Sequence, residues 1–193
     1  MPYTACVIMK DMKMPLVKLK AILIYFCENT DPKFLGKVKL MKLFYFLDFV
    51  HVKKYGIPVT FDNYVNLEHG PIPSTIKNLV DEVCGDDADN SVLADTIYCE
   101  KPKEVMINRI LPKRRLSEND KKYFSKSELD VLETVCMRFG TKNTKHIEDV
   151  SHEEAPWKMT NLLDNIPYTL AINDKDCVVS KEEIELFSKI YPN

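Results

Sequence analysis

Histidine and glutamate stand side by side in the segment Ser-His-Glu-Glu-Ala-Pro-Trp-Lys, residues 151–158, in a sequence with little other concentrated chemistry. His152 and Glu153 could act as an acid–base pair, and His69 could join them in a hydrolase site or a metal site. Zinc hydrolases of the His-Glu-x-x-His type place two histidines one helical turn apart, and His152 has no such neighbour. The sequence therefore predicts no metal, no cofactor and no enzyme, and a hydrolase that uses His69, His152 and Glu153 stays open as an alternative.

The cysteines offer no better nucleophile. None stands on a glycine-bounded turn that would expose it, and the sequence holds neither a Cys-x-x-Cys pair nor a glycine-rich phosphate loop. We see no secretory signal that would carry the chain to an oxidising compartment. We therefore expect a cytoplasmic protein with six reduced, mostly buried thiols: Cys6, Cys27, Cys84, Cys99, Cys136 and Cys177.

Composition describes an ordinary globular chain of 193 residues, with 45% hydrophobic and 29% charged residues and a net charge of -2. This balance gives no general attraction for nucleic acid or acidic membranes. The best basic patch, residues 113–115, is diluted by Glu118 and Asp120. The most apolar run, residues 40–50, is too short for a membrane span and contains Lys42 and Asp48. We expect no membrane association and no strong nucleic-acid binding by the chain alone.

The spacing of apolar residues predicts a mainly helical α+β domain, compact, with a few short strands. Residues 16–29 and 36–55 form the first two helices, and the second is the core helix, with Lys37, Lys39 and Lys53 reaching water. A short strand over residues 59–65, a turn at Gly70 and a helix from Pro73 to Val83 follow. We expect residues 1–15 to be a disordered extension and residues 16–193 to form one domain.

The second half of the chain predicts a small hairpin and three capped helices. Strands at residues 96–100 and 104–110 flank a Lys-Pro-Lys turn. Capping boxes, in which a hydroxyl and a carboxylate satisfy free amides at a helix start, are expected at Ser125 with Glu128, at Ser151 with Glu154 and at Ser180 with Glu183. A further short helix covers residues 144–150, and the 160s and 170s are expected to form a connecting loop that contains Pro167. Trp157 then pins the corner after Pro156 against the body of the domain.

Several segments, in this order, resemble one family. They are KLMKLFYFLD, YGIPV, HGPIPSTI, FSKSELDVLETV and SHEEAPWK, and their most specific parts are Lys42-Leu43-x-Tyr45, Gly70-Pro71-x-Pro73 and His152-Glu153-x-x-Pro156-Trp157. Together they resemble the Panacea domain, also called the SocA-like antitoxin domain and related to phage-associated GepA proteins. The resemblance runs from about Leu16 to Ile190.

The resemblance implies an antitoxin of a toxin–antitoxin system that neutralises a toxin protein, encoded by an adjacent gene, through direct contact. The SocA branch also resembles a protease adaptor that delivers its toxin to ClpXP. Many relatives add a DNA-binding helix-turn-helix, for which the chain leaves no room beside the common domain. A phage-associated interaction protein without a toxin is a further alternative.

A binding protein needs an exposed contact surface, and the GPIP turn and the Pro-Trp corner supply the candidates. Tyr45, Tyr64 and Trp157 are expected to be partly exposed aromatic anchors. Four further residues in these segments complete the predicted partner-binding set: His69, Pro71, His152 and Glu153.

Overall fold

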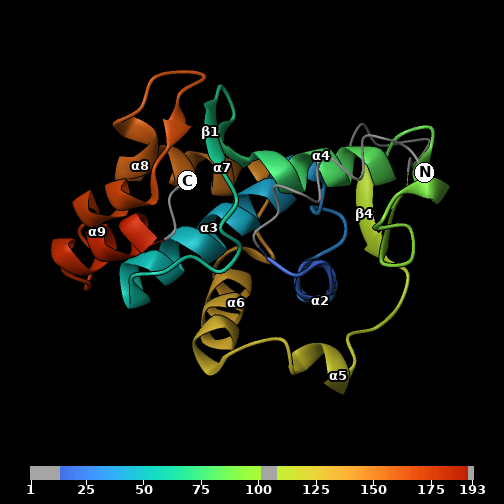
Figure 1. Ribbon diagram of the computed structural model, residues 1–193. Helices are drawn as coiled ribbons and strands as arrows, with labels where there is room; N and C mark the ends of the chain where they lie inside the picture. The colour runs from blue at the N-terminus through green and yellow to red at the C-terminus, as the bar shows by residue number, and fades with distance from the viewer. Residues whose placement is uncertain (1–13, 101–107, 191–193) are drawn as a thin grey trace.

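A computed structural model describes residues 14–100 and 108–190, with helix α3 (Lys37–Tyr55) at its centre (Figure 1). Every residue of α3 from Lys39 to Lys53 is buried. The helix contacts α6 (Lys126–Phe139), α7 (Thr144–Glu153) and strand β2 (Gly70–Pro73). The predicted core helix is therefore confirmed, because several elements pack around it and bury all of its sides.

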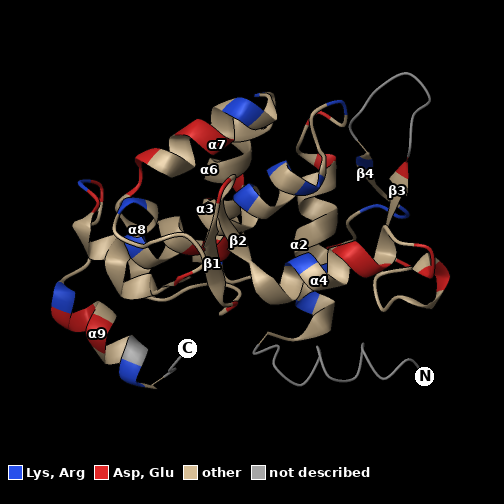
Figure 2. Ribbon diagram, turned by 90° about the horizontal axis from the view of Figure 1, so that it is seen from above, with Lys and Arg blue, Asp and Glu red and all other residues tan. Residues whose placement is uncertain are grey.

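The remaining elements form a compact α+β arrangement around α3, as the sequence predicts. Basic and acidic residues are interspersed along the described elements, in keeping with the small net charge of the sequence (Figure 2). The other helices and 3-10 helices are α2 (Leu16–Glu28), α4 (Ser74–Val83), η1 (Ala88–Asn90), α5 (Glu118–Lys121), α8 (Ala155–Lys158), η2 (Tyr168–Asn173) and α9 (Lys181–Ile190). Among the residues that the structure describes, no helix combines the length and apolar character that crossing a membrane requires.

Two small antiparallel sheets complete the fold. In the first, β1 (Tyr64–Leu67) lies between β2 and β5 (Asn165–Ile166), and its last residue pairs with Gly70 across a tight turn. In the second, β3 (Ile97–Glu100) pairs with β4 (Arg109–Pro112). The predicted hairpin is confirmed, although its second strand begins later than expected and its turn lies outside the described residues. The GPIP segment, predicted to be only a turn, is strand β2.

Two of the three predicted capping boxes are present. Ser125 and Glu128 cap α6 reciprocally, and Ser180 and Glu183 make the same exchange before α9. The box at Ser151 is wrong: α7 runs on to Glu153, so Ser151 lies inside a helix and donates to the carbonyl of Glu148 at 2.7 Å. A hydroxyl in a helix interior commonly bonds back to the preceding turn, so the motif alone does not mark a helix start.

Two lysines of α3 do not reach water as predicted. Lys39 and Lys53 are buried, and of the three lysines predicted to reach water only Lys37 keeps a half-exposed side chain. The Lys39 ammonium donates to the carbonyls of Gly140 at 3.0 Å and Lys142 at 2.6 Å, just after α6 ends. A buried ammonium is tolerated where it finds such acceptors, and hydrophobic periodicity does not reveal them.

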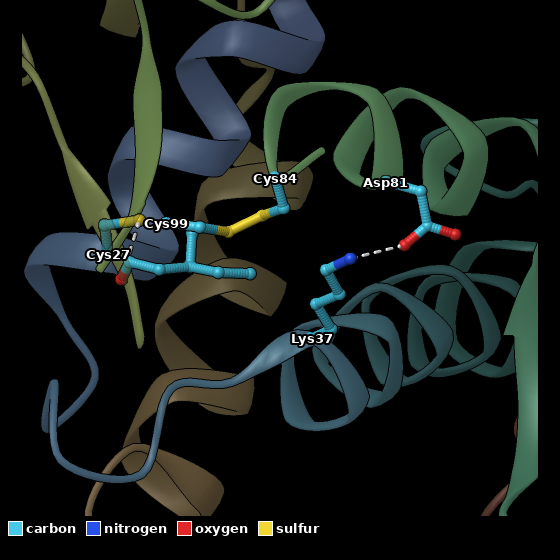
Figure 3. Close-up of a disulfide and its surroundings, with 6 residues drawn as sticks. Cys27, Lys37, Asp81, Cys84 and Cys99 are labelled. Atoms are coloured by element: carbon cyan, nitrogen blue, oxygen red, sulfur yellow. Dashed lines mark hydrogen bonds and ion pairs between the residues drawn. A yellow bond between two sulfur atoms is a disulfide. The ribbon is translucent and has the colours of Figure 1, made fainter. Parts of the chain in front are cut away.

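A disulfide joins Cys84, which follows α4, to Cys99 on β3 (Figure 3). The expectation of six reduced thiols is therefore wrong for this pair, which the chain brings together across a separation of 15 residues. Cys27 and Cys136 are free and buried, as expected, and Cys177 is half-buried. Cys6 lies outside the described residues, as does most of the predicted extension, whereas Met14 packs against the core.

Candidate functional site

Three motif segments that are distant in the sequence meet at Gly70, the first residue of β2. Gly70 has φ +89°, a conformation that side chains disfavour. A Cβ atom built there would lie 2.8 Å from Ser151 Oγ, 2.9 Å from Lys42 Nζ and 3.0 Å from His152 Nε2. Only glycine therefore lets the end of the β1–β2 turn approach α3 and α7 this closely.

Lys42, on α3, also holds the β1–β2 turn in place. Its fully buried ammonium donates to the carbonyl of Pro71 at 2.8 Å. Burial lowers the pKa of Lys42 to about 7, against the opposing attraction of Glu148. The lysine and the Gly-Pro turn of the motif are thus parts of one contact between the core helix and the sheet.

The rings of His152 and Trp157 stack face to face at the corner between α7 and α8, with centroids 4.0 Å apart. Both residues are half-buried, and neither His152 Nε2 nor Trp157 Nε1 has a hydrogen-bond partner in the structure. Burial lowers the pKa of His152, which favours the neutral ring at neutral pH. The predicted role of Trp157 as a structural corner agrees with this packing, and its predicted partial exposure is confirmed.

Glu154 ties the corner to the core through an ion pair rather than through a helix cap. Its carboxylate lies 3.0 Å from the buried Lys53 ammonium, which also contacts Asp174 at 3.4 Å and Asp176 at 3.0 Å. Burial raises the pKa of Glu154 to about 7, although Lys53 opposes the rise. This cluster joins α3, the corner and the segment after η2.

A second buried carboxylate, Asp48, belongs to α3 itself and organises another hydrogen-bond network. It accepts from the amides of Val59 at 2.8 Å and Thr60 at 2.7 Å, and from the Thr60 hydroxyl. The hydroxyls of Tyr64 and Tyr168 also donate to it, at 2.9 Å and 3.1 Å. Burial raises the pKa of Asp48 to about 6, while these hydrogen bonds oppose the rise.

These networks explain why two predicted anchors are not on the surface. Tyr45 is 0% and Tyr64 is 1% exposed, so the expectation that they are partly exposed is wrong. The two rings pack edge to face, and their hydroxyls point to carboxylates inside the fold, at Glu154 and Asp48. A tyrosine is buried readily when its hydroxyl finds such an acceptor.

The other predicted residues lie near one another, but the histidines and Glu153 face separate partners. His69, at the β1–β2 turn, has Nδ1 3.4 Å from Glu148, while exposed Glu153 pairs with Lys158 at 2.6 Å. Their side chains do not meet His152, which stacks on Trp157, so the structure does not assemble the hydrolase trio. Within residues 14–100 and 108–190, no three histidine, cysteine or acidic residues are placed to hold a metal ion.

A surface hollow of about 550 Å³ opens beside the Lys53 cluster. Its lining mixes acidic Glu153, Glu154 and Asp174 with basic Arg138 and Lys158. Because the opposite charges largely balance, the hollow selects no ligand by charge.

Asp48, Lys53 and Tyr168 hold the site together, and sequence reasoning missed all three. For Asp48 a signal was available. Asp48 and Lys42 interrupt the most apolar run of the sequence, where a charged residue must be either exposed or paired inside. Tyr168 offered no comparable signal, since it stands in a segment expected to be a loop.

The fold and site thus define a compact α+β domain in which the motif residues hold α3, the sheet of β1 and β2, and the α7–α8 corner together. Residues 40–158, well over half of the chain, match the family model of the SocA-like antitoxin, Panacea domain. The chain belongs to this family. Neither the curated proteins nor the solved structures provide a match. The family match ends at Lys158, although η2 and the residues after it contribute Tyr168 and Asp174 to the same core.

Proposed function

We propose that the protein is the antitoxin of a toxin–antitoxin pair and neutralises a toxin protein by direct contact. The observation that carries the proposal is the family match over residues 40–158, which contains every motif residue that joins α3, the β1–β2 turn and the α7–α8 corner. The charged groups of this site are paired within the chain: the Lys42 ammonium with the carbonyl of Pro71, and the Glu154 carboxylate with Lys53. Such an arrangement suits a regulator that presents a surface better than an enzyme that needs free reactive groups.

The proposed contact surface follows the β1–β2 turn and the α7–α8 corner. His69 and Glu153 contribute exposed side chains, with fractions of 66% and 77%, and the His152–Trp157 stack contributes a half-buried aromatic surface. Pro71 shapes the turn from within and is buried. A central aromatic surface with a polar rim is a common arrangement in protein interfaces.

We further propose that the toxin is encoded by an adjacent gene and that the pair acts in the cytoplasm. A phage-associated setting, related to that of GepA proteins, is compatible with the same surface. In that compartment the disulfide between Cys84 and Cys99 would face a reducing thiol pool.

Coexpression with the products of the two flanking genes tests the proposal. One product is expected to arrest growth when expressed alone, to permit growth when this protein is coexpressed, and to copurify with it. If neither product arrests growth, or arrest persists despite equal expression, the antitoxin proposal is wrong.

Delivery to ClpXP is the finer version of this function, and the resemblance to the SocA branch makes it the second candidate. The same coexpression in cells with and without ClpXP separates the two mechanisms. Neutralisation by contact predicts rescue in both strains with the toxin still present and bound. An adaptor predicts rescue only where ClpXP is present, with loss of the toxin.

A further inference from the structure

The loop that follows α8, residues 159–164, projects from the same side of the molecule as the β1–β2 turn (Figures 1 and 2). Three large apolar side chains of this loop face solvent: Met159 is 57%, Leu162 is 61% and Leu163 is 72% exposed. Single exposed apolar residues are common on protein surfaces, whereas three within five residues on one projecting loop are not.

Hydrogen bonds from the buried Asn66 hold this loop in one conformation. The Asn66 side-chain amide donates to the carbonyl of Trp157 at 3.2 Å and to the carbonyl and hydroxyl of Thr160 at 2.9 Å and 3.0 Å. Its backbone accepts from Leu163 N–H at 2.7 Å and donates to the carbonyl of Asp164 at 2.9 Å. The exposed apolar side chains are therefore presented by a fixed backbone rather than by a loose loop.

Leu163 adopts φ +72°, a conformation that leucine rarely takes. A leucine that is strained and mostly exposed adds little to the stability of the fold. Strained residues of this kind persist where the surrounding structure imposes them, and they are concentrated at functional sites.

Two exposed acidic side chains belong to this loop and to the neighbouring β1–β2 turn. Asp164 is the last residue of the loop, and Glu68 lies at the β1–β2 turn; both are exposed. Glu68 is two residues from Asn66, whose carbonyl accepts the hydrogen bond from Leu163. The nearest basic side chain along the chain, Lys158, is paired with Glu153. The rim therefore offers negative charge to an approaching partner.

We propose that the 159–164 loop and the β1–β2 turn insert into an apolar groove of a partner protein whose rim carries lysine or arginine. This inference rests on the proposed function, because it takes the toxin as that partner. It places the energetic centre of the interface at Leu162 and Leu163, beside the His152–Trp157 stack, with Glu68 steering association.

Calorimetric titration against the purified product of the flanking gene whose arrest is relieved tests this surface. The double variant Leu162→Asp, Leu163→Asn should bind about 30-fold or more weakly, as expected for central apolar anchors. Its Tm should stay within about 3 °C of the wild type, since asparagine tolerates positive φ and both side chains are exposed. Glu68→Lys should mainly slow association and weaken its dependence on salt.

Val178→Asp is the matched control, because Val178 is 77% exposed but lies in the segment before α9, away from this loop. It should bind as the wild type does. If the folded double variant binds and rescues as well as the wild type, the surface is wrong while the antitoxin function stands. If the wild type relieves the arrest but does not bind this product, neutralisation by direct contact is wrong and the proposed surface is wrong with it.

Discussion

The interior around α3 and the 159–164 loop invert the usual distribution of polar and apolar groups. Lys42, Asp48 and Lys53 are buried, whereas Met159, Leu162 and Leu163 are exposed. The buried charges all have partners within the chain, as the Lys53 cluster illustrates at 3.0 to 3.4 Å. The stability of the fold therefore explains the buried charges. It does not explain the exposed leucines, which we attribute to the binding of a partner protein.

Removing Lys53 should produce the largest effect on stability. Lys53→Met leaves Glu154 and Asp174 without their buried cation, and breaking a buried pair on one side costs about 3–5 kcal/mol. Urea denaturation measures this change. The double variant Lys53→Met, Glu154→Gln should recover part of the loss, and an unchanged midpoint for Lys53→Met would show that the buried charges do not stabilise the fold.

The pH dependence of stability should show the raised pKa of Asp48. Burial raises its pKa to about 6 in the folded protein, above the value of about 3.9 in an unfolded chain. The folded state therefore binds more protons in this window, and the Asp48 contribution to stability should fall by about 2 kcal/mol as pH rises from 4 to 6.5. Relative to Asp48→Asn, the wild type should lose stability over that range; a parallel dependence of both proteins would contradict the raised pKa.

Trp157 lies between the interior around α3 and the 159–164 loop, and its replacement should change stability less than the loss of Lys53 does. Because the ring is half-buried and stacks on His152, Trp157→Ala should cost about 1–2 kcal/mol, less than a fully buried ring would. Thermal unfolding measures the change, with Trp157→Phe as the control that keeps a stacked ring. A fully stable Trp157→Ala protein would contradict the role of the corner in holding the fold.

Replacing Leu163 should stabilise the protein slightly. Leu163→Gly relieves the positive φ at little loss of buried area, so unfolding should require about 1 kcal/mol more. Thermal unfolding shows the effect as a rise in Tm of about 2–4 °C. A fall in Tm would mean that the leucine serves the fold and would weaken the contrast with the interior.

Glu153→Gln should have the smallest effect. Glu153 is 77% exposed and its pair with Lys158 is on the surface, so the change in stability should stay within about 0.5 kcal/mol. Growth rescue by coexpression should also be nearly unchanged. A stable Glu153→Gln protein that still copurifies with the toxin but no longer rescues would indicate a catalytic carboxylate and revive the hydrolase alternative, whereas loss of both binding and rescue would place Glu153 in the contact.

Periodicity and capping motifs were sufficient to predict the core helix, α6 and the α+β class. They failed where a polar side chain finds its partner far along the chain. Ser151 and Glu154 have the spacing of a capping box, yet the glutamate bonds Lys53, 101 residues away. Asp48 likewise meets Tyr168 across 120 residues, and no local pattern encodes such a contact.

For the site, the sequence identified the correct segments but not the exposure of their side chains. The GPIP turn and the Pro-Trp corner do lie together, joined at Gly70 and His152. Tyr45 and Tyr64 proved to be interior, because hydroxyls that point to buried carboxylates cannot be told from surface hydroxyls by residue type. The exposed leucines of the 159–164 loop were missed because the segment was predicted to be only a connection.

The dose dependence of rescue tests neutralisation by contact most directly. In cells that lack ClpXP, the toxin and this protein would be expressed at graded, quantified levels, and growth would be measured against their ratio. Binding by contact predicts that growth returns only as the two proteins approach equal amounts. Full rescue by a small fraction of one equivalent, or no rescue at any ratio, would contradict it.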